Sequence, residues 1–406
     1  MECIHVWQVV TLSGILLWIM VSSFFKLSQK LRSLIQPWVT HHVITDTPLI
    51  LHIQSFQHGL LDALFSVLSC VVSVPFYTTF LPLLFWSGHG RLARQMTLLM
   101  AFCDYIGNCI KDTVSAPRPS SPPVRRVTAT EDEKENALEY GLPSSHTLNT
   151  VCLSGYLLHY LLSYAQNIDG ALVLAGGSMA CLLVALVGLG RIYLGMHSLV
   201  DVLGGLVIGM VILAFWLMVN EYLDSFIVSG PNVTFFWAAL SFLLLFAYPT
   251  PEVPTPSFEY HTAFNGVAFG IVSGVQQTYL QFHHEDVPRV FSPQLSLQVL
   301  SARVLVGIPT ILAVKFCTKA LSKWILPVVS NTLGIQIRST SYIPALNGSI
   351  SSKNSDASRQ SGYLQKLLFS HQNSFDVDTG IRFLQYAGLA WAVVDLIPSL
   401  FSHLRL

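Results

Sequence analysis

Charged residues are scarce in this chain. Asp, Glu, Lys and Arg make up 11% of its 406 residues, whereas hydrophobic residues make up 52% and the mean hydropathy is +0.55. A water-soluble domain carries about 25% charged residues. Because a charge in hydrocarbon costs several kcal/mol, this scarcity predicts a membrane protein. The 22 basic residues equal the 22 acidic ones, so no positive excess points to a nucleic-acid partner.

Patterns of metal and redox sites are also missing. The seven cysteines form no CxxC pair and no zinc spacing, and most lie in or beside apolar stretches, so we interpret them as small hydrophobic residues. No carboxylate cluster suited to calcium or magnesium is obvious, and we expect no metal and no other cofactor. The apolar N-terminus, from about Val9 to Phe25, lacks a basic leader and a good cleavage site, which favours an uncleaved span.

Long apolar runs, in contrast, are plentiful. About 20 apolar residues in a helix cross the 30 Å hydrocarbon core of a bilayer. No alternating pattern of a membrane β-barrel is present, so we expect an all-α polytopic bundle of eight to ten helices. The candidate runs are 9–25, 60–88 (one kinked span, or a span plus a re-entrant piece), 92–110, 147–165, 171–190, 199–219, 233–250, 262–281, 301–320 and 381–401.

Polar segments divide these runs into groups. Residues 251–261 are rich in proline and predict a short loop, while residues 330–380 are rich in serine and asparagine and predict a disordered insertion. We find no internal repeat. The expected organisation is an N-terminal span with a connecting segment (1–59), a catalytic core (60–220) and additional C-terminal spans (221–406).

Three short polar clusters stand at the ends of predicted spans. The first follows the span 92–110 and shares a loop with the second. Two further crossings return the chain to the third, so all three face the same side of the membrane. The clusters are Lys111 with Arg118-Pro119, Pro143-Ser144-Ser145-His146, and Arg191 with His197 and Asp201.

The third cluster has the composition of an activated nucleophile. His197 and Asp201 are four residues apart and therefore share one helical face. The carboxylate can accept a hydrogen bond from one ring nitrogen and leave the other nitrogen free to attack. His146 is a second histidine that can protonate a leaving oxygen.

The same surface offers several groups that bind phosphate. Lys111, Arg118 and Arg191 supply three cations, and arginine forks match pairs of phosphate oxygens. Ser144 precedes a helix start, where free backbone N–H groups favour an anion. The set suits phosphate-ester hydrolysis, whose rate must rise by up to ~10²¹-fold, with only about 10²–10⁴ available from a general acid.

Each cluster alone is weak evidence. A lone histidine near an interface is usually structural, and a basic residue at the end of a span is usually an anchor. The occurrence of all three clusters, in order and on one side, favours a phosphoryl-transfer site.

These residues resemble the three motifs of the type 2 phosphatidic acid phosphatase superfamily, namely K-x6-R-P, P-S-G-H and S-R-x5-H-x3-D, over residues 60–220. The resemblance implies a six-helix core with its site at the membrane face, and no metal. It implies that His197 attacks phosphorus to form a phosphohistidine and Asp201 orients it, while His146 protonates the leaving alcohol. The phosphate-binding residues it implies are Lys111, Arg118, Ser144, Ser145 and Arg191.

Two positions depart from the general motifs. Ser145 stands where glycine is usual, and Gly190 stands where serine is usual. Ser145 and the run from Arg191 to Ser198 resemble the corresponding motif residues of sphingosine-1-phosphate (long-chain base 1-phosphate) phosphatases, more specifically of their plant and fungal members. Gly190 removes one hydroxyl that would contact phosphate.

The resemblance implies a sphingoid base 1-phosphate as substrate in the bilayer. Phosphatidate or a polyprenyl diphosphate is the alternative substrate. A transporter or binding protein for lipid phosphates is the alternative of another class. We also consider that one or more of the carboxylates Glu131, Asp132 and Glu133 meet the substrate's ammonium group, although a solvated acidic loop is the simpler interpretation.

The subfamily resemblance further suggests the endoplasmic reticulum membrane, with the site facing the lumen. Arg91 and Arg94 then lie on the cytosolic side, as the positive-inside rule prefers, whereas the basic residues after the first span count against it. Asn347-Gly-Ser is a possible glycosylation site. Protein partners are not predicted.

Overall fold

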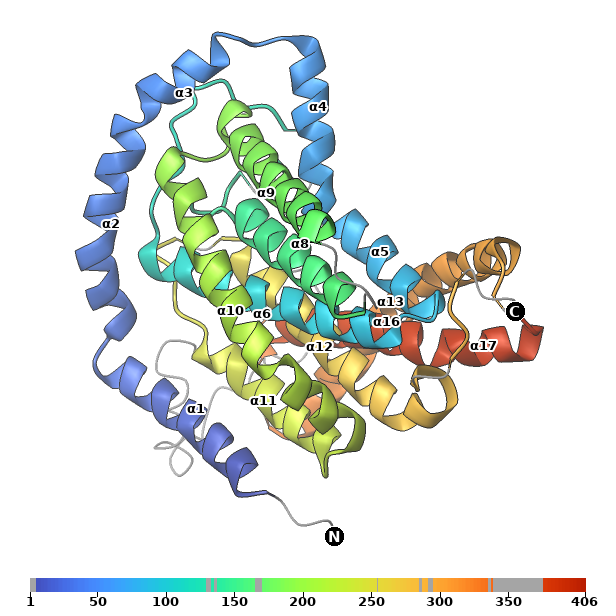
Figure 1. The fold of residues 1–406 in the computed structure, drawn as a ribbon. Coiled ribbons are helices and arrows are strands. Elements are labelled where there is room, and N and C mark those ends of the chain that lie inside the picture. The colour runs from blue at the N-terminus through green and yellow to red at the C-terminus, as the bar shows by residue number, and fades with distance from the viewer. Residues whose placement is uncertain are drawn as a thin grey trace, which may run out of the picture.

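The computed structural model describes residues 5–128, 133–134, 137–164, 170–253, 255–284, 287–290, 295–334, 337–338 and 375–406. These residues are almost entirely helical, which confirms the predicted all-α polytopic class (Figure 1). Two strands of two residues each, β1 (Ile337–Arg338) and β2 (Phe375–Asp376), pair in parallel.

The N-terminal residues form a helical strap along one side of the bundle (Figure 1). A helix replaces most of the connecting segment that the sequence predicts after the first span. Arg32 and Gln36 of this strap donate hydrogen bonds to backbone carbonyls at the end of α6, at 2.8 Å to Asp112 and 2.8 Å to Ser115. These donors satisfy carbonyl groups that a helix end leaves free. The strap consists of α1 (Val6–Phe24), α2 (Leu27–Thr45) and α3 (Thr47–Gln54).

The run 60–88 forms two helices at an angle. α4 (Gly59–Ser69) and the short η1 (Cys70–Val72) are bent by 52° from α5 (Val74–Trp86). Pro75 lies in the first turn of α5, where its missing N–H costs nothing, and Ser73 caps that turn. The bend brings residues on both of its sides to the cavity that the three polar clusters line.

Four helices carry the three polar clusters: α6 (Gly90–Val114), α8 (Ser145–Tyr164), α9 (Gly170–Tyr193) and α10 (Leu199–Ser229). α8 packs against the other three. Glycines on α10 permit this close approach. A Cβ on Gly205 would lie 2.6 Å from the Ser144 carbonyl oxygen, and one on Gly209 would lie 3.0 Å from that of Leu148. The α8–α10 contact therefore fixes the start of α8 beside the start of α10.

The C-terminal helices complete the bundle. α12 packs against both α6 and α16, and Gly266 and Gly270 bring α12 against the backbone of α16. This packing places one face of α12 beside the cavity that the three polar clusters line. The elements are α11 (Val233–Ala247), α12 (Ser257–Thr278), the π-helical η2 (Tyr279–His283), α13 (Leu297–Thr332), α16 (Val377–Val394) and α17 (Leu396–Leu404).

The number of strongly apolar spans is smaller than expected. Within the described residues, five helices are long and apolar enough to cross a membrane, or up to six if the bent pair counts as one. The difference from eight to ten lies in α11, which has only 15 residues, and in α6, α8 and α12, which have 25, 20 and 22 residues but carry many polar side chains. Many polar side chains of α6, α8 and α12 are buried inside the bundle, as Lys111, His146 and His261 are.

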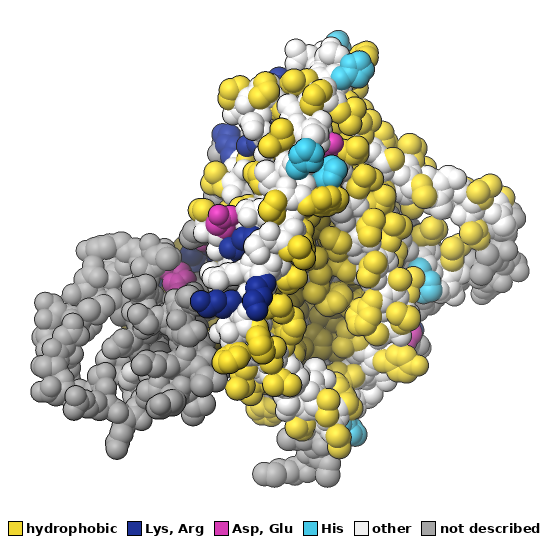
Figure 2. Space-filling model, turned by 90° about the vertical axis from the view of Figure 1, so that its left-hand side faces the viewer, with side chains coloured by type: hydrophobic (Ala, Val, Ile, Leu, Met, Phe, Trp, Pro, Cys, Tyr) yellow, Lys and Arg dark blue, Asp and Glu magenta, His cyan; other side chains and the backbone are white. Residues whose placement is uncertain are grey.

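Hydrophobic side chains cover much of the outer surface. Figure 2 shows this on the face where α1 to α3 lie, with Lys and Arg side chains gathered on a narrow strip. On α10, Val211 and Met218 are 64% and 66% exposed. A broad apolar exterior of this kind is typical of a surface in contact with lipid.

Candidate active site

The three clusters meet in one cavity of about 420 Å³, within the range of small-molecule sites. The cavity lies where the last turns of α6 and α9, the first turn of α8 and the loop before α10 come together. The cluster residues that line it are Lys111, Arg118, Ser145, His146, Arg191 and His197. The structure thus brings together side chains from positions 86 residues apart in the chain.

The tautomer of His197 follows from its contacts. Nε2 lies 2.9 Å from Nη1 of Arg118. A guanidinium group only donates hydrogen bonds, so Nε2 accepts and carries the lone pair, which leaves the proton on Nδ1. The unprotonated nitrogen of His197 is therefore the one beside Arg118.

Asp201 lies behind the imidazole, on the Nδ1 side. Its Oδ2 is 3.6 Å from His197 Nδ1 and accepts a hydrogen bond of 2.9 Å from the Ser198 N–H, as part of the capping box of α10. Both side chains are almost fully buried. The separation exceeds a hydrogen bond, and catalytic hydrogen bonds are often long before substrate binds. The cap holds the carboxylate where it can orient the ring.

The surroundings of His197 keep its imidazole neutral. Burial places the pKa of His197 well below its usual value of 6.5, and the nearby positive charges of Arg118 and Arg191 lower it further. A neutral imidazole at physiological pH has a lone pair available for attack.

Two glutamates already contact the three cations. Glu139 forms an ion pair with Lys111, and its backbone oxygen accepts a hydrogen bond of 2.9 Å from Arg118 Nε. Glu133 Oε1 lies 2.8 Å from Arg191 Nη1. Both glutamates are buried and line the cavity. Sequence reasoning missed Glu139, because nothing in its spacing separates it from other charges of this loop.

The serines of the second cluster have different positions. Ser144 is fully buried, and its hydroxyl accepts hydrogen bonds from the backbone N–H and the hydroxyl of Thr147, at 3.5 and 3.1 Å. It therefore caps the start of α8, and it does not line the cavity. Ser145, the next residue, does line it, as does His146.

The glycine at position 190 has a packing reason. A Cβ there would lie 2.8 Å from Cδ1 of Phe65 on α4, too close without a shift of that ring. On the same helix as Phe65, Ser69 places its hydroxyl 3.0 Å from Nη1 of Arg191. α4 thus excludes a side chain at position 190 and supplies a hydroxyl near the same cation.

Away from the cations the cavity becomes apolar. Its far part is lined by Pro75, Phe76 and Tyr77 of α5 and by Phe264 of α12. Asp104 and Asn108 of α6 and Asn149 of α8 also line the cavity, one to two turns deeper along their helices than Lys111 and His146. A cavity with a cationic end and an apolar end suits a lipid phosphate, whose tail stays in the hydrocarbon.

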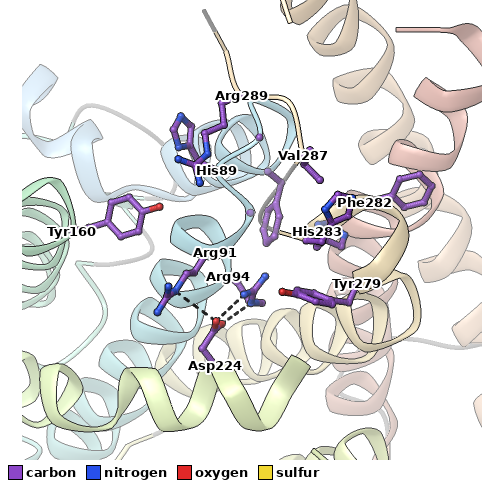
Figure 3. Close-up of a pocket in the computed structure, with 14 residues that line it drawn as sticks. His89, Arg91, Arg94, Tyr160, Asp224, Tyr279, Phe282, His283, Val287 and Arg289 are labelled. Carbon is purple, nitrogen blue, oxygen red and sulfur yellow. Dashed lines mark hydrogen bonds and ion pairs between the residues drawn. The ribbon is translucent and has the colours of Figure 1, made fainter. Parts of the chain in front are cut away.

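A second cavity, at the opposite end of α6, is much smaller (Figure 3). Its volume is about 40 Å³, enough for a few water molecules. Arg94 forms two hydrogen bonds to Asp224, of 2.6 and 2.8 Å, which join α6 to α10. We interpret the contact between Arg94 and Asp224 as structural.

Some sequence predictions fall elsewhere. Glu131, Asp132 and Asn347 lie outside the described residues, as does most of the segment 330–380. Glu133, the third member of the acidic run, contacts Arg191. Within the described part of the chain, no group of three or more His, Cys, Asp or Glu side chains is arranged to hold a metal ion.

Comparisons with known proteins agree with this geometry. Residues 92–225 match the PAP2 superfamily. The chain is 67% identical to lipid phosphate phosphatase delta of Arabidopsis thaliana, over 100% of this chain and 98% of the relative. It is 29% identical to a dihydrosphingosine 1-phosphate phosphatase of Schizosaccharomyces pombe, over 92% of this chain and 90% of the relative. It is 33% identical to sphingosine-1-phosphate phosphatase 2 of Mus musculus, over 49% of this chain and 54% of the relative. No solved structure matches the chain.

The identity to a lipid phosphate phosphatase extends over the whole chain, and the PAP2 match covers all of the third cluster and the Lys111 and His146 positions. Together with the apolar helices, these findings place the chain in a known group: it belongs to the PAP2 superfamily and is a multi-pass membrane lipid phosphate phosphatase.

Proposed function

We propose that this phosphatase hydrolyses a sphingoid long-chain base 1-phosphate to the free base and inorganic phosphate, without a metal ion. Two relatives carry the names of sphingoid base phosphate phosphatases, one of them aligned over 92% of this chain. The cavity supports the proposal, because it joins a cationic end to an apolar one.

In the first step, the bound phosphate draws the hydrogen bond of Arg118 away from Nε2 of His197, and the freed lone pair attacks phosphorus. A P–N bond forms and the P–O bond to the lipid breaks. His146, which takes up a proton when the phosphate dianion binds beside it, transfers that proton to the departing oxygen. Asp201 orients the imidazole and stabilises the positive charge that develops on it. In the second step, water gives a proton to His146 and attacks phosphorus, and the P–N bond breaks to release phosphate.

The cations bind the phosphoryl oxygens during both steps. Lys111, Arg118 and Arg191 surround the space beside His197, and preorganised positive charge of this kind is often the largest single contribution to catalysis. The first turn of α8, beginning at Ser145, adds backbone N–H groups. Substrate must displace the side chains of Glu139 and Glu133 from Lys111 and Arg191.

The observation that carries this proposal is that Nε2 of His197 accepts a hydrogen bond from Arg118 inside the cavity that Lys111 and Arg191 also line. The guanidinium thus lies beside the attacking atom, where it can pass its hydrogen bond from Nε2 to the phosphate. No step requires a metal ion.

The test is phosphate release by purified full-length protein in detergent micelles containing EDTA. We expect release from a sphingoid base 1-phosphate to exceed release from phosphatidate and from a polyprenyl diphosphate. His197→Ala should abolish release from all three. Faster hydrolysis of either other lipid would overturn the substrate assignment, and loss of activity in EDTA would overturn metal independence. A His197→Ala protein that still moves lipid phosphates between membranes would point to a transporter.

We also propose that the protein resides in the endoplasmic reticulum membrane with its active site toward the lumen. Glycosidase treatment that lowers the mass of the wild type, but not of Asn347→Gln, would support a lumenal position for that loop. Protection of the site from a membrane-impermeant lipid-phosphate analogue in sealed microsomes would agree with it, and free access would contradict it.

A further inference from the structure

The middle of the cavity contains a carboxylate with no catalytic assignment. Asp104 lies on α6, and within the described residues no ion pair joins it to a cation. Its one hydrogen bond comes from Asn108, at 3.0 Å from Nδ2 to Oδ2. Because an ionisable side chain in a membrane helix is costly, it usually has a function.

The position of Asp104 along α6 relates it to the phosphate end. Asp104, Asn108 and Lys111 are spaced i, i+4 and i+7, so they share one face of the helix. Seven residues of helix correspond to about 10 Å, and the side chain of Lys111 leans back toward Asp104. The two charges interact electrostatically, as Asp104 also does with Glu139. Asp104 is therefore about two turns deeper along α6 than Lys111.

The opposite wall repeats this order. On α8, Asn149 follows His146 by three residues and lies one turn deeper on the same face. Asn149 is only 6% exposed, and its amide oxygen has no hydrogen-bond partner among the described residues. A buried acceptor without a partner costs free energy, which a donor on a ligand would recover. Both walls thus present acceptors deeper than the phosphate end, about one turn down on α8 and about two turns down on α6.

We propose that Asp104, with Asn149, forms a subsite for the ammonium and hydroxyl groups of an amino-alcohol phosphate, and so selects a sphingoid base 1-phosphate over lipids without a free amine. In that substrate the ammonium lies on the second carbon and the hydroxyl on the third, between phosphate and tail. Positions along α6 and α8 give the same order of cations and acceptors, and apolar side chains of α5 and α12 complete the cavity lining. This inference rests on the proposed function and identifies its specificity residues.

Charge balance favours the same substrate. Lys111, Arg118 and Arg191 share the cavity with Asp104, Glu133 and Glu139. A phosphate dianion alone meets repulsion from these carboxylates, whereas an ammonium beside the phosphate offsets it. Phosphatidate brings no such positive charge.

The experiment compares two substrates that differ only in the amine: a sphingoid base 1-phosphate and its N-acetyl derivative, in the same micelles. The ratio of their kcat/KM values, measured within one preparation, is independent of the fraction of active protein. We expect Asp104→Asn to lower kcat/KM for the free amine by about tenfold, as for a charged hydrogen bond, and to leave the N-acetyl substrate nearly unchanged. Asp104→Glu should keep most of the preference.

Asp112→Asn is the matched control. Asp112 is on the same helix and is buried, but it binds Tyr248 and Thr255 and does not line the cavity. This variant should keep the wild-type ratio. Equal losses for both substrates in Asp104→Asn, or a wild type without preference for the amine, would overturn the subsite while leaving a sphingoid phosphatase intact. A wild type that hydrolyses phosphatidate and neither sphingoid substrate would overturn the proposed function and the subsite together.

Discussion

The guanidinium of Arg118 and the imidazole of His197 meet at 2.9 Å, from Nη1 to Nε2. This contact has two consequences. It fixes the lone pair of His197 on the cavity side, and it adds a positive charge that helps to lower the pKa of His197. Backbone contacts to Met196 at 2.6 Å and Glu139 at 2.9 Å hold the guanidinium in place.

Asp201→Asn should reduce kcat far more than it reduces stability. Asparagine can still accept the hydrogen bond that caps α10, but it lacks the charge that stabilises the imidazolium. We expect a fall in kcat of about 10²–10⁴-fold with little change in KM. Steady-state kinetics and a thermal-unfolding scan check both parts. A fall below tenfold would argue against an orienting role for Asp201.

The pH dependence of kcat/KM should respond to Arg118. Because the pKa of His197 is well below 6.5, protonation of the nucleophile does not limit the wild type near neutral pH, and activity falls only as pH drops toward that low pKa. Arg118→Gln removes a positive charge, so the pKa of His197 rises and the acid limb moves to higher pH. The phosphate of the substrate titrates equally in both proteins and cancels in the comparison. A shift to lower pH would contradict the assignment.

Glu139→Gln should strengthen inhibition by inorganic phosphate. The carboxylate now pairs with Lys111, so phosphate must compete with it for this cation. Its neutral replacement should lower the inhibition constant several-fold, in line with about 1–2 kcal/mol for a charged contact. Glu252→Gln, at a glutamate that binds Gln36 outside the cavity, serves as control. An unchanged inhibition constant would mean that displacing Glu139 from Lys111 costs no free energy.

Gly190→Ser, which restores the residue usual in the family motif, should destabilise this protein. The new Cβ would stand 2.8 Å from Phe65, and overpacking of this kind typically costs about 1–3 kcal/mol. Phe65→Leu in the same chain should recover part of the loss, because the smaller side chain leaves room. Thermal-unfolding midpoints of the single and double variants in detergent test the coupling. Additive effects would show that Phe65 is not the obstacle.

The sequence predicts the bend between α4 and α5, but it does not predict where the bend lies relative to the cavity. Pro75 and Pro82 predict a break in the run 60–88, and the break is present. That the break opens onto the functional cavity, with Ser69 near Arg191, depends on how α4 packs against α9. Proline chemistry is local, whereas this packing joins segments more than 100 residues apart.

In the candidate active site, too, the sequence predicts some relationships and tertiary packing decides others. Lys111, His146 and His197 stand at helix ends on one side of the bilayer, so their proximity follows from counting crossings. Their catalytic roles stay predictions. Ser144 was expected at the phosphate, but its side chain caps α8, because the contact with α10 turns it inward. Asp104 and Glu139 carried no signal in the sequence, since a lone carboxylate in a helix or a loop has no characteristic spacing.

The sequence alone determined the membrane environment, the helical class and the residue types of a phosphoryl-transfer site, because hydropathy and motif spacing are local properties of the chain. Only the tertiary structure decided which carboxylates and amides share the cavity with the cations, and why position 190 is glycine. Those relationships depend on distances across the bundle, which arise when helices far apart in the chain pack together.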